Sequence, residues 1–460
     1  MQDIPNINLS SFHDYDVRGI YGEEIDERFF YHLGKSIAQY VGPGTTIGVG
    51  RDARPSSPSL TENLIKGVTD YGCNVVNLGE ISTEIHYYVS GKYRLDANVI
   101  VTASHNPPEY NGAKIVLKDT LPLHGGFGLP EIKELMNQEL PVAAQKGSVS
   151  ELSVLDEYVK FARTLVDTKN FKKLKVVVDA GNGMGGPVWQ KITPHLKNIE
   201  IIPLHLDVDC TFPNHPADPI KKENTEELSA KVVATKADFG IALDGDADRI
   251  FFVDDKGERL SGGKTLALFM EYFLSRGEMG TFVYNASIGR IVPDVAKKYG
   301  APVARVRGGH AFFKAKLRET NGIFGGEHSG HYGYHKTFYC EMTLVFGLMM
   351  MDILSNKKIT LSEIRKQYDI YPESGEINFR DANTKEVLRE LKELFKKEAT
   401  DISDIDGTAF TLPDAWFIVR SSQTEPLTRL NMDAENETIL TSRLSQITTL
   451  LEKHGGVRRA

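Results

Sequence analysis

Cysteine is scarce in this chain, and no long apolar run is present. The three cysteines, Cys73, Cys210 and Cys340, are odd in number and lie far apart in the 460 residues. This pattern is typical of reduced thiols and argues against a disulfide framework or a cysteine-bound metal. The longest apolar stretch, residues 343–354, is about twelve residues long, too short for a bilayer, and indicates a buried helix. The first residues show no basic or apolar leader, so we expect a cytoplasmic protein without a membrane partner.

Basic residues are not in excess either. The chain has 54 Lys and Arg side chains against 62 Asp and Glu, a formal net charge of −8 at pH 7. Nucleic-acid-binding surfaces are usually basic, so we expect no nucleic-acid partner. Hydrophobic residues make up 41% and charged residues 25%, which is typical of a globular protein. The length predicts about three or four domains, and an anionic ligand would need a few local cations to hold it.

What the chain does have is a repeated arrangement of apolar strand, polar loop and helical segment. The arrangement occurs three times, about a hundred residues apart, which is too long a period for a solenoid. Strands that alternate with helical patterns predict mixed or parallel sheets with helices on both faces. We therefore predict three related α/β domains. The strands on which this prediction depends are 46–50, 97–102, 175–179, 239–243 and 281–284.

The segment after Tyr371 follows a different pattern. Apolar residues recur at helical spacing in 387–395, with Thr384 as the expected N-cap, and again in 440–451. Adjacent strands between two helices predict a smaller α+β domain. The strand-like runs are 408–412, 415–419 and 427–432. The predicted divisions of the chain are 1–150, 151–254, 255–370 and 371–460.

A rigid polar loop follows the strand at 97–102. It reads Thr102-Ala-Ser-His-Asn-Pro-Pro108 and ends in two prolines. A serine in such a loop is well placed as a nucleophile or phosphate carrier, although an ordinary strand-to-loop cap would use the same residues. Neighbouring side chains usually diverge, so we do not expect Ser104 and His105 to act as a pair, and we expect the Ser104 hydroxyl to be exposed. The chain has no G-x-S-x-G pattern, which argues against a serine hydrolase.

Three carboxylates follow the apolar run 239–243, in Asp244-Gly-Asp-Ala-Asp-Arg249. They repel one another unless a cation is present. At alternate positions of an extended segment they would share one face, and oxygen ligands of this kind select Mg²⁺, Mn²⁺ or Ca²⁺. The spacing does not match an EF-hand, which needs glycine where Arg249 stands. A solvated acidic turn is the alternative.

Residues 181–186 match the G-x-G-x-x-G pattern after a strand, which is typical of dinucleotide binding. The acidic residue expected about twenty positions later is not cleanly placed, so the signal is weak. The alternative is a tight strand-to-helix turn that packs closely because it lacks side chains.

Two further polar segments have chemistry that suits a sugar phosphate. Residues 326–331, Gly-Glu-His-Ser-Gly-His, offer a carboxylate and a hydroxyl to a polyol, and they lack the spacing of a zinc site. Residues 420–426, Arg-Ser-Ser-Gln-Thr-Glu-Pro, together with Arg429, offer guanidinium forks and hydroxyls to a phosphate. Taken singly, the second segment could equally be a polar turn.

Together these segments make the sequence similar to the α-D-phosphohexomutases, most closely the bacterial phosphomannomutase/phosphoglucomutase group. The likeness runs along the whole chain. It depends on Tyr15-Asp-Val-Arg-Gly19, Thr102–Pro107, Asp244–Arg249, Gly326–Gly330 and Arg420–Pro426. The resemblance implies four domains around a central cleft, three α/β and one smaller α+β.

The resemblance also implies roles for individual residues. Ser104 would be the phosphoserine and would hold Mg²⁺ with the three aspartates, Asp244, Asp246 and Asp248. The catalytic residues would be Ser104, Lys114, Arg18, Arg249 and His331. Lys114 is the first candidate for proton transfer and His331 the second, and a cationic cluster would have to lower the pKa of Lys114. The substrate-binding residues would be Tyr15, His310, Glu327, Ser329, Arg420, Ser422, Gln423, Thr424 and Arg429.

The implied reaction interconverts hexose 1-phosphate and hexose 6-phosphate through a hexose 1,6-bisphosphate, which would also be an activator. The substrates would be sugar phosphates, and the enzyme a monomer or small homo-oligomer. Hydroxyls at C3 and C4 lie between the two ends of the sugar, so a site that recognises them accepts both mannose and glucose.

This chain departs from the family in two places. Asn285-Ala-Ser287 stands where relatives often have a basic residue, so that the next cation is Arg290, and Gln423 replaces Asn or Gly. The nearest alternative is a phosphoglucosamine mutase, which usually has Gly at Gln423 and Gln at His328. The others are a nicotinamide-dependent oxidoreductase that uses 181–186 and a non-catalytic sugar-phosphate binder.

Overall fold

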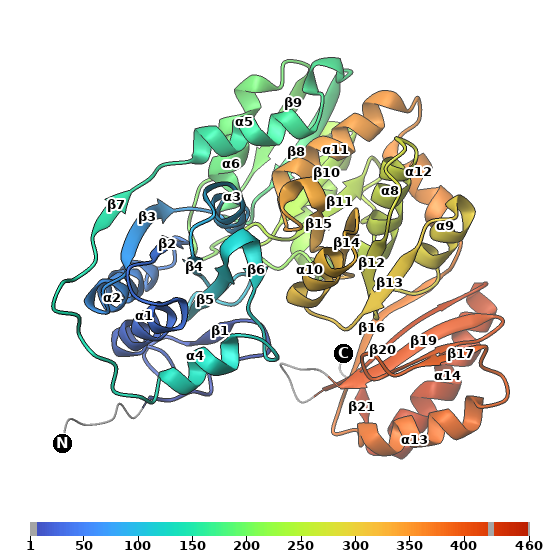
Figure 1. The fold of residues 1–460 in the computed structure, drawn as a ribbon. Coiled ribbons are helices and arrows are strands. Elements are labelled where there is room, and N and C mark those ends of the chain that lie inside the picture. Colours follow the sequence, from blue (N-terminus) through green and yellow to red (C-terminus); the bar gives the residue numbers. More distant parts are fainter. Residues whose placement is uncertain (1–6, 422–426, 459–460) are drawn as a thin grey trace. The chain divides into compact units, whose positions relative to one another are not determined.

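The computed structural model describes residues 7–421 and 427–458 (Figure 1). These residues form two compact units. The first takes in the chain up to Leu260 and the segment Ser329–Ser362, and the second takes in Ser261–His328 and the chain from Glu363 onward. Within the described residues no helix has both the length and the apolar character needed to cross a bilayer.

The first unit begins with a mixed seven-stranded sheet in the order β1-β5-β4-β2-β3-β7, with β6 paired to β5. Strands β2, β3, β4 and β7 are parallel, and β5 and β1 are antiparallel to their neighbours. The strands are β1 (Val17–Ile20), β2 (Thr46–Arg51), β3 (Asn74–Glu80), β4 (Ala97–Val101), β5 (Tyr110–Leu117), β6 (Leu121–Pro122) and β7 (Val149–Glu151). The helices are α1 (Glu27–Val41), α2 (Ser57–Asp70), α3 (Thr83–Tyr93) and α4 (Leu129–Leu135).

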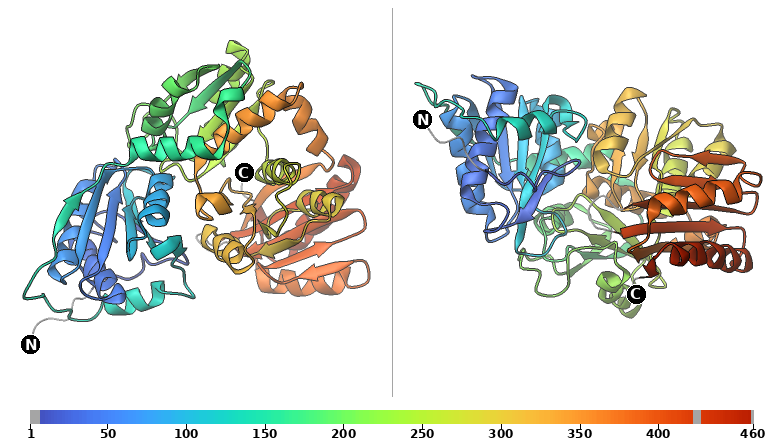
Figure 2. Two further views of the ribbon diagram at one scale, coloured as in Figure 1. Left: turned by 45° about the horizontal axis from the view of Figure 1, so that its top comes forward. Right: turned by 90° about the horizontal axis from the view of Figure 1, so that it is seen from below.

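Helices cover both faces of this sheet, as the sequence pattern predicts. Successive side chains of a strand point to opposite faces. On β5, Ile115 belongs to the core that contains Leu33 of α1 and Leu64 of α2, whereas Val116 packs with Tyr87 of α3. The blue and cyan part of Figure 2 shows the strands between these helices.

A second mixed sheet completes the first unit, in the order β11-β10-β8-β9. Strands β8, β9 and β10 are parallel, and β11 is antiparallel to β10. The elements around this sheet are α5 (Leu155–Leu165), β8 (Leu174–Asp179), α6 (Gly185–Ile192), β9 (Ile199–Leu204), α7 (Glu226–Thr235), β10 (Phe239–Leu243) and β11 (Ile250–Asp254). The segment Ser329–Ser362 of the same unit adds β15 (Tyr332–Tyr334), which is not a strand of this sheet, and α11 (Thr343–Asn356). Helix α11 is the apolar stretch predicted to be a buried helix, and its residues from Thr343 to Met351 are all buried.

The second unit contains a parallel set, β13-β12-β14, and a six-stranded antiparallel sheet, β17-β18-β19-β20-β16-β21. The first set has α8 (Gly262–Leu274), β12 (Phe282–Asn285), α9 (Ile291–Tyr299), β13 (Val303–Val306), α10 (His310–Glu319) and β14 (Phe324–Gly326). The second has β16 (Glu373–Arg380), α13 (Thr384–Phe395), β17 (Asp401–Ser403), β18 (Thr408–Thr411), β19 (Ala415–Ser421), β20 (Leu427–Ala434), α14 (Glu437–Lys453) and β21 (Val457–Arg458). Helix α12 (Leu361–Tyr368) runs across the division between the two units.

The two helices of the antiparallel part, α13 and α14, share one face of its sheet (Figure 1). Phe417 and Val419 of β19 pack with these helices, while Trp416 and Ile418 on the opposite face pack with Ala286 after β12. The predicted organisation, three α/β segments with mixed sheets and a smaller α+β segment, is confirmed. The predicted N-cap of α13 was wrong by one residue, because the side chain of Asn383, not Thr384, accepts the N–H of Glu386.

Candidate active site

Ser104 lies just after β4 in a sharply turned loop. Its φ is 52°, in the left-handed region that residues with a Cβ rarely adopt. The residue is 2% exposed, and its hydroxyl donates to Asp244 Oδ2 at 2.7 Å. The expectation of an exposed hydroxyl was therefore wrong, because the second sheet of the same unit covers the loop. The serine of the first sheet and the acidic loop of the second form one site.

The left-handed turn also brings Ser104 and His105 together. Ser104 Oγ and His105 Nδ1 are 3.2 Å apart, so the expectation that these side chains diverge was wrong. Alternation of side chains holds for extended backbone, and Ser104 is not extended. Burial lowers the pKa of His105 well below its ordinary value, and the charges of Arg249, Arg18 and Lys114 act in the same direction. His105 is therefore neutral, and its Nδ1 lies within hydrogen-bonding distance of the serine oxygen.

The acidic loop between β10 and β11 is a turn, not the extended segment that the sequence suggested. Ala247 has φ 60°, and its N–H donates to the carbonyl of Asp244. Asp244 Oδ1 accepts the N–H groups of Asp248 and Arg249, both at 3.0 Å. This wrapping brings one oxygen of each aspartate to within 4.8 Å of the others, and all three residues are fully buried.

The three carboxylates have the properties of a site for a hard cation. Burial raises the pKa of Asp244 well above its ordinary value, and repulsion from Asp246 and Asp248 adds to the effect. Within the described residues, Asp246 Oδ1 and Asp248 Oδ1 are buried and accept no hydrogen bond. A cation bound there would relieve both the repulsion and the unmet acceptors, and a set of oxygen donors alone fits Mg²⁺. The alternative of a solvated acidic turn does not match this burial.

Lys114 on β5 is the main counter-charge of the acidic loop. Its Nζ donates to Asp246 Oδ2 and to Asp248 Oδ2, both at 2.5 Å. Burial alone would lower the pKa of Lys114, but attraction by Asp246, Asp248 and Asp244 outweighs burial and raises it. The sequence-based role as proton acceptor required a lowered pKa, and the structure has the opposite direction because carboxylates, not cations, surround the ammonium group.

Two arginines and a histidine complete this cluster. Arg18 donates to Asp16 and, through Nη1, to Asn106 Oδ1 at 2.7 Å in the serine loop. Arg249 Nε donates to His331 Nε2 at 2.9 Å. Because Nε2 of His331 accepts this hydrogen bond, it carries no proton. Tyr15 lies near both arginines and raises their pKa values through its charge.

Sequence reasoning missed three buried residues behind the site: Glu341, Thr83 and Glu84. Glu341 Oε1 lies 3.4 Å from His331 Nδ1, and this nitrogen also lies 3.6 Å from Asp248 Oδ1. Thr83 at the start of α3 donates its hydroxyl to Asp246 Oδ2 at 2.6 Å and its N–H to the carbonyl of Asp246. Glu84 accepts from Leu344 N at the start of α11 and from Tyr158 Oη. These residues lie within helices or between motifs, so no local pattern could have found them.

The glycine-rich turn at 181–186 packs against the acidic loop. A Cβ at Gly183 would lie 2.5 Å from the carbonyl oxygen of Gly245, and Met184 N donates to that same oxygen at 2.9 Å. This contact leaves no room for a pyrophosphate at Gly183. The turn is the tight strand-to-helix packing that was the alternative to dinucleotide binding.

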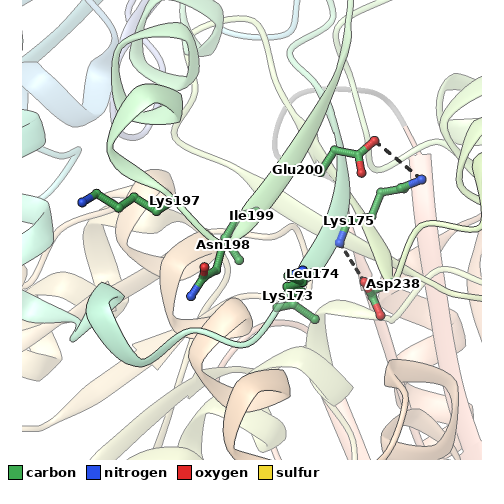
Figure 3. Close-up of a pocket in the computed structure, with 8 residues that line it drawn as sticks. All are labelled: Lys173, Leu174, Lys175, Lys197, Asn198, Ile199, Glu200 and Asp238. Carbon is green, nitrogen blue, oxygen red and sulfur yellow. Dashed lines mark hydrogen bonds and ion pairs between the residues drawn. The ribbon is translucent and has the colours of Figure 1, made fainter.

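A pocket elsewhere in the first unit is separate from this cluster (Figure 3). It has a volume of about 390 Å³ and lies where β8 and β9 begin, whereas the acidic loop follows the opposite ends of the parallel strands. Lys175 N donates to Asp238 Oδ2, and Lys175 Nζ pairs with Glu200, as the dashed lines show (Figure 3). The side chain of Lys175 therefore has an acidic partner, and the pocket lies at the strand ends opposite to the acidic loop.

In the second unit, the sugar-binding candidate Glu327 follows β14 and is 3% exposed. Its Oε1 accepts the N–H of Gly309 at 2.6 Å, immediately before His310 at the start of α10. The N-terminus of a helix is a favourable position for a carboxylate, and Glu327 lies there next to His310. The chain then passes into the first unit, where partly buried Ser329 precedes Gly330, whose carbonyl accepts Ile250 N.

The phosphate-binding candidates Arg420 and Arg429 are cross-strand partners on β19 and β20. Both interact with Glu376 of β16, at 3.2 Å for Arg420 Nη2 and 3.5 Å for Arg429 Nε. Glu376 was not anticipated, because its place beside them depends on strand order. Ser422, Gln423 and Thr424 lie outside the described residues. Arg290, the nearest cation after Asn285-Ala-Ser287, donates to Asp433 at 2.7 Å.

Comparison with known proteins agrees with this arrangement. Three family models match in succession, described as phosphoglucomutase/phosphomannomutase α/β/α domains I, II and III, over residues 9–141, 156–257 and 261–371. Phosphomannomutase of Escherichia coli strain K12 is 32% identical over 454 residues, covering 97% of this chain and 99% of that protein. Phosphomannomutase/phosphoglucomutase of Pseudomonas putida is 34% identical over 440 residues, covering 93% and 92%.

Among solved structures, a phosphoglucomutase/phosphomannomutase family protein of Burkholderia thailandensis superposes with a TM-score of 0.87 at 30% identity and covers 98% of each chain. The likeness in sequence and in fold therefore extends over nearly the whole length of the protein. Such a match, together with the buried serine and aspartates, establishes an intramolecular phosphotransferase, and this chain belongs to the phosphoglucomutase/phosphomannomutase family of phosphohexomutases.

Proposed function

We propose that this phosphohexomutase transfers a phosphoryl group between Ser104 and a hexose phosphate, with a hexose 1,6-bisphosphate as the intermediate. In the first step a sugar hydroxyl attacks the phosphorus of phosphoserine, the P–Oγ bond breaks, and a P–O bond to the sugar forms. After the bisphosphate has turned around, Ser104 Oγ takes the other phosphoryl group. The observation that carries this proposal is the 2.7 Å contact between the buried Ser104 hydroxyl and Asp244.

We assign Mg²⁺ to the three aspartates, Asp244, Asp246 and Asp248, together with an oxygen on Ser104. When bound, the ion neutralises negative charge on the phosphoryl group and the departing oxygen. Arg18 and Arg249 lie at the edge of the acidic cluster, where they would hold the oxygens of the phosphoryl group. For the proton of the attacking hydroxyl, Lys114 remains the first candidate and His331 the second. Lys114 would have to give up one of its carboxylate contacts to serve.

The remaining roles follow the same proposal. Glu327, Ser329 and His310, with Tyr15, would bind the sugar, and Arg420 and Arg429, with Ser422, Gln423 and Thr424, would hold the phosphate that is not transferred. The divisions 1–150, 151–254, 255–370 and 371–460 would separate serine, metal, sugar and phosphate functions. We place the enzyme in the cytoplasm, since its three cysteines are buried and free.

Peptide mass spectrometry of active enzyme tests the serine. One phosphate on Ser104, and its loss together with turnover in Ser104→Ala, is the expected result. Because Ser104 is buried, the alanine variant also leaves Asp244 Oδ2 without its donor, so its thermal unfolding is measured alongside. Ser148→Ala, at an exposed serine, serves as the control. Phosphate on another serine with Ser104 bare contradicts the mechanism.

The choice of sugar is tested in a coupled assay with the 1-phosphates of glucose, mannose and glucosamine, with a hexose 1,6-bisphosphate added as activator. We expect glucose and mannose 1-phosphates to react with specificity constants within about a hundredfold of each other. A preference for glucosamine 1-phosphate would instead favour a phosphoglucosamine mutase.

A further inference from the structure

Arg54 lies in the loop between β2 and α2, and its side chain is buried to 1% exposure. A guanidinium has five N–H donors. Here all five have acceptors: Nε donates to Asp52 Oδ2, Nη1 to the carbonyls of Pro107 and Tyr110, and Nη2 to those of Ser104 and Asn106. The four carbonyl contacts are 2.6, 3.0, 2.9 and 2.7 Å long, respectively.

Three of the four carbonyls belong to the loop that carries Ser104, and the fourth is that of Tyr110, where the loop ends and β5 begins. The four oxygens converge on one planar fork, which lysine, with three donors at a single nitrogen, cannot reproduce. The buried charge is balanced by Asp52, whose Oδ1 accepts Ser57 Oγ and Arg54 N. A buried ion pair with every donor satisfied is costly to disturb, so the loop has one preferred conformation.

This conformation has two consequences for the active site. Ser104 is held at φ 52°, a backbone state that is unfavourable for a residue with a Cβ and needs support from its surroundings. The same loop presents Asn106 Oδ1 to Arg18 Nη1. Arg54 is thus linked directly to the carbonyl of Ser104 and, through Asn106, to Arg18.

We propose that Arg54 is a positioning residue of the mutase reaction: its guanidinium fixes the conformation of the 104–110 loop and thereby aligns Ser104 Oγ and Arg18. All guanidinium N–H groups of Arg54 are used by Asp52 and the four carbonyls, so none is left to donate to a substrate. The effect on catalysis rests on the proposed role of Ser104, whereas the effect on the loop does not.

The test compares Arg54→Lys with Arg259→Lys. Arg259 is a matched control in the same unit, since its Nη1 also donates to two loop carbonyls, those of Pro219 and Ile220. For R54K we expect kcat to fall about 10–100-fold with KM within about threefold, because the reacting atoms are displaced while the substrate contacts remain. R259K should keep kcat within about twofold of the unsubstituted enzyme, and the thermal unfolding of both variants is measured alongside.

Hydrogen exchange measures the loop directly. Asn106 N and Tyr110 N donate to carbonyls inside the loop, and we expect both to exchange faster in R54K and at an unchanged rate in R259K. Unchanged exchange of these two N–H groups in R54K overturns the proposal, whether or not Ser104 carries the phosphate of the active enzyme. A kcat within threefold of the unsubstituted enzyme, or an equal loss in R259K, also overturns it.

A second variant, Asp52→Asn, is used if R54K does not fold. The amide weakens the hydrogen bond from Arg54 Nε and leaves the four carbonyl contacts in place. We expect kcat of this variant to fall about 3–10-fold. An unchanged kcat in D52N overturns the proposal. Phosphate absent from Ser104 in the unsubstituted enzyme would refute the proposed function, while the exchange data would still decide whether Arg54 positions the loop.

Discussion

The acidic cluster of the first unit is enclosed, whereas the two candidate phosphate-binding arginines of the second unit are partly exposed. Asp244, Asp246 and Asp248 are fully buried, and Lys114 is bonded to two of them. In the second unit the side chains of Arg420 and Arg429 are 12% and 21% exposed and share the partly exposed Glu376. Groups that act on a reacting bond gain from a fixed, dry environment. Groups that capture an arriving anion must stay within reach of solvent.

This difference predicts a division of kinetic effects. Substitutions in the enclosed cluster should lower kcat, because they remove interactions made while charge builds up on the phosphoryl group. Substitutions at the accessible arginines should raise KM, because those contacts persist throughout the reaction. The experiments below can break this division.

The largest effect is expected for Asp244→Asn. The amide keeps the shape of the side chain. It removes one negative charge from the acidic cluster, and it removes the carboxylate oxygen that accepts the hydrogen bond from Ser104 Oγ. We expect kcat to fall about 10²–10³-fold in steady-state assays, and Mn²⁺ binding, followed by its paramagnetic resonance signal, to weaken. Asp238→Asn, before β10 at its opposite end, is the control. A change confined to KM, or unweakened Mn²⁺ binding, contradicts the assignment.

Arg429→Ala should act on the other kinetic parameter. Losing one charge-assisted bond to a phosphate costs about 1.5–3 kcal/mol, so we expect KM to rise about 10–100-fold with kcat within about threefold. Arg389→Ala, at an arginine 69% exposed on α13, should change neither value. If R429A lowers kcat as strongly as D244N does, the proposed division of roles is wrong.

Glu327→Ala should have a smaller and more even effect. If Glu327 binds hydroxyls between the two ends of the sugar, the specificity constants for glucose and mannose 1-phosphates should fall together, by about tenfold each. The informative quantity is their ratio, which we expect to change by less than about threefold. Loss of one sugar alone would mean that Glu327 contacts the C2 hydroxyl.

The smallest effect concerns Glu84 and pH. Burial raises the pKa of Glu84 from its ordinary 4.5 to about 7, although the hydrogen bonds from Leu344 N and Tyr158 oppose the shift. The folded protein then keeps a proton that the unfolded chain releases between these values, so its stability falls as pH rises from about 4.5 to 7. Glu84→Gln should remove about 1–3 kcal/mol of this dependence, measured by urea unfolding at several pH values. Parallel curves for the two proteins would contradict the raised pKa.

Much of the candidate site could be predicted because its motifs follow apolar strands. The loops after 97–102 and 239–243 stood out as polar residues at strand ends, the segments 326–331 and 420–426 stood out by their side-chain chemistry, and the resemblance added Arg18 and Lys114. Thr83, 163 residues from its partner Asp246, could not be found this way. The same holds for Arg54, whose carbonyl partners lie about fifty residues further along the chain. Such contacts depend on which elements the fold brings together, and no local spacing encodes them.

The sequence by itself determined the alternation of strands and helices, the α+β character of the last segment and the residue types of the candidate site. These depend on short-range periodicity and on side-chain chemistry, which are local properties. Only the tertiary structure decided that Ser104 is buried against Asp244, that the acidic loop is a turn, and that Lys114 has a raised pKa. Solvation and electrostatic energies depend on the distances between groups and on the water excluded around them, and both are set by packing between sheets distant in sequence.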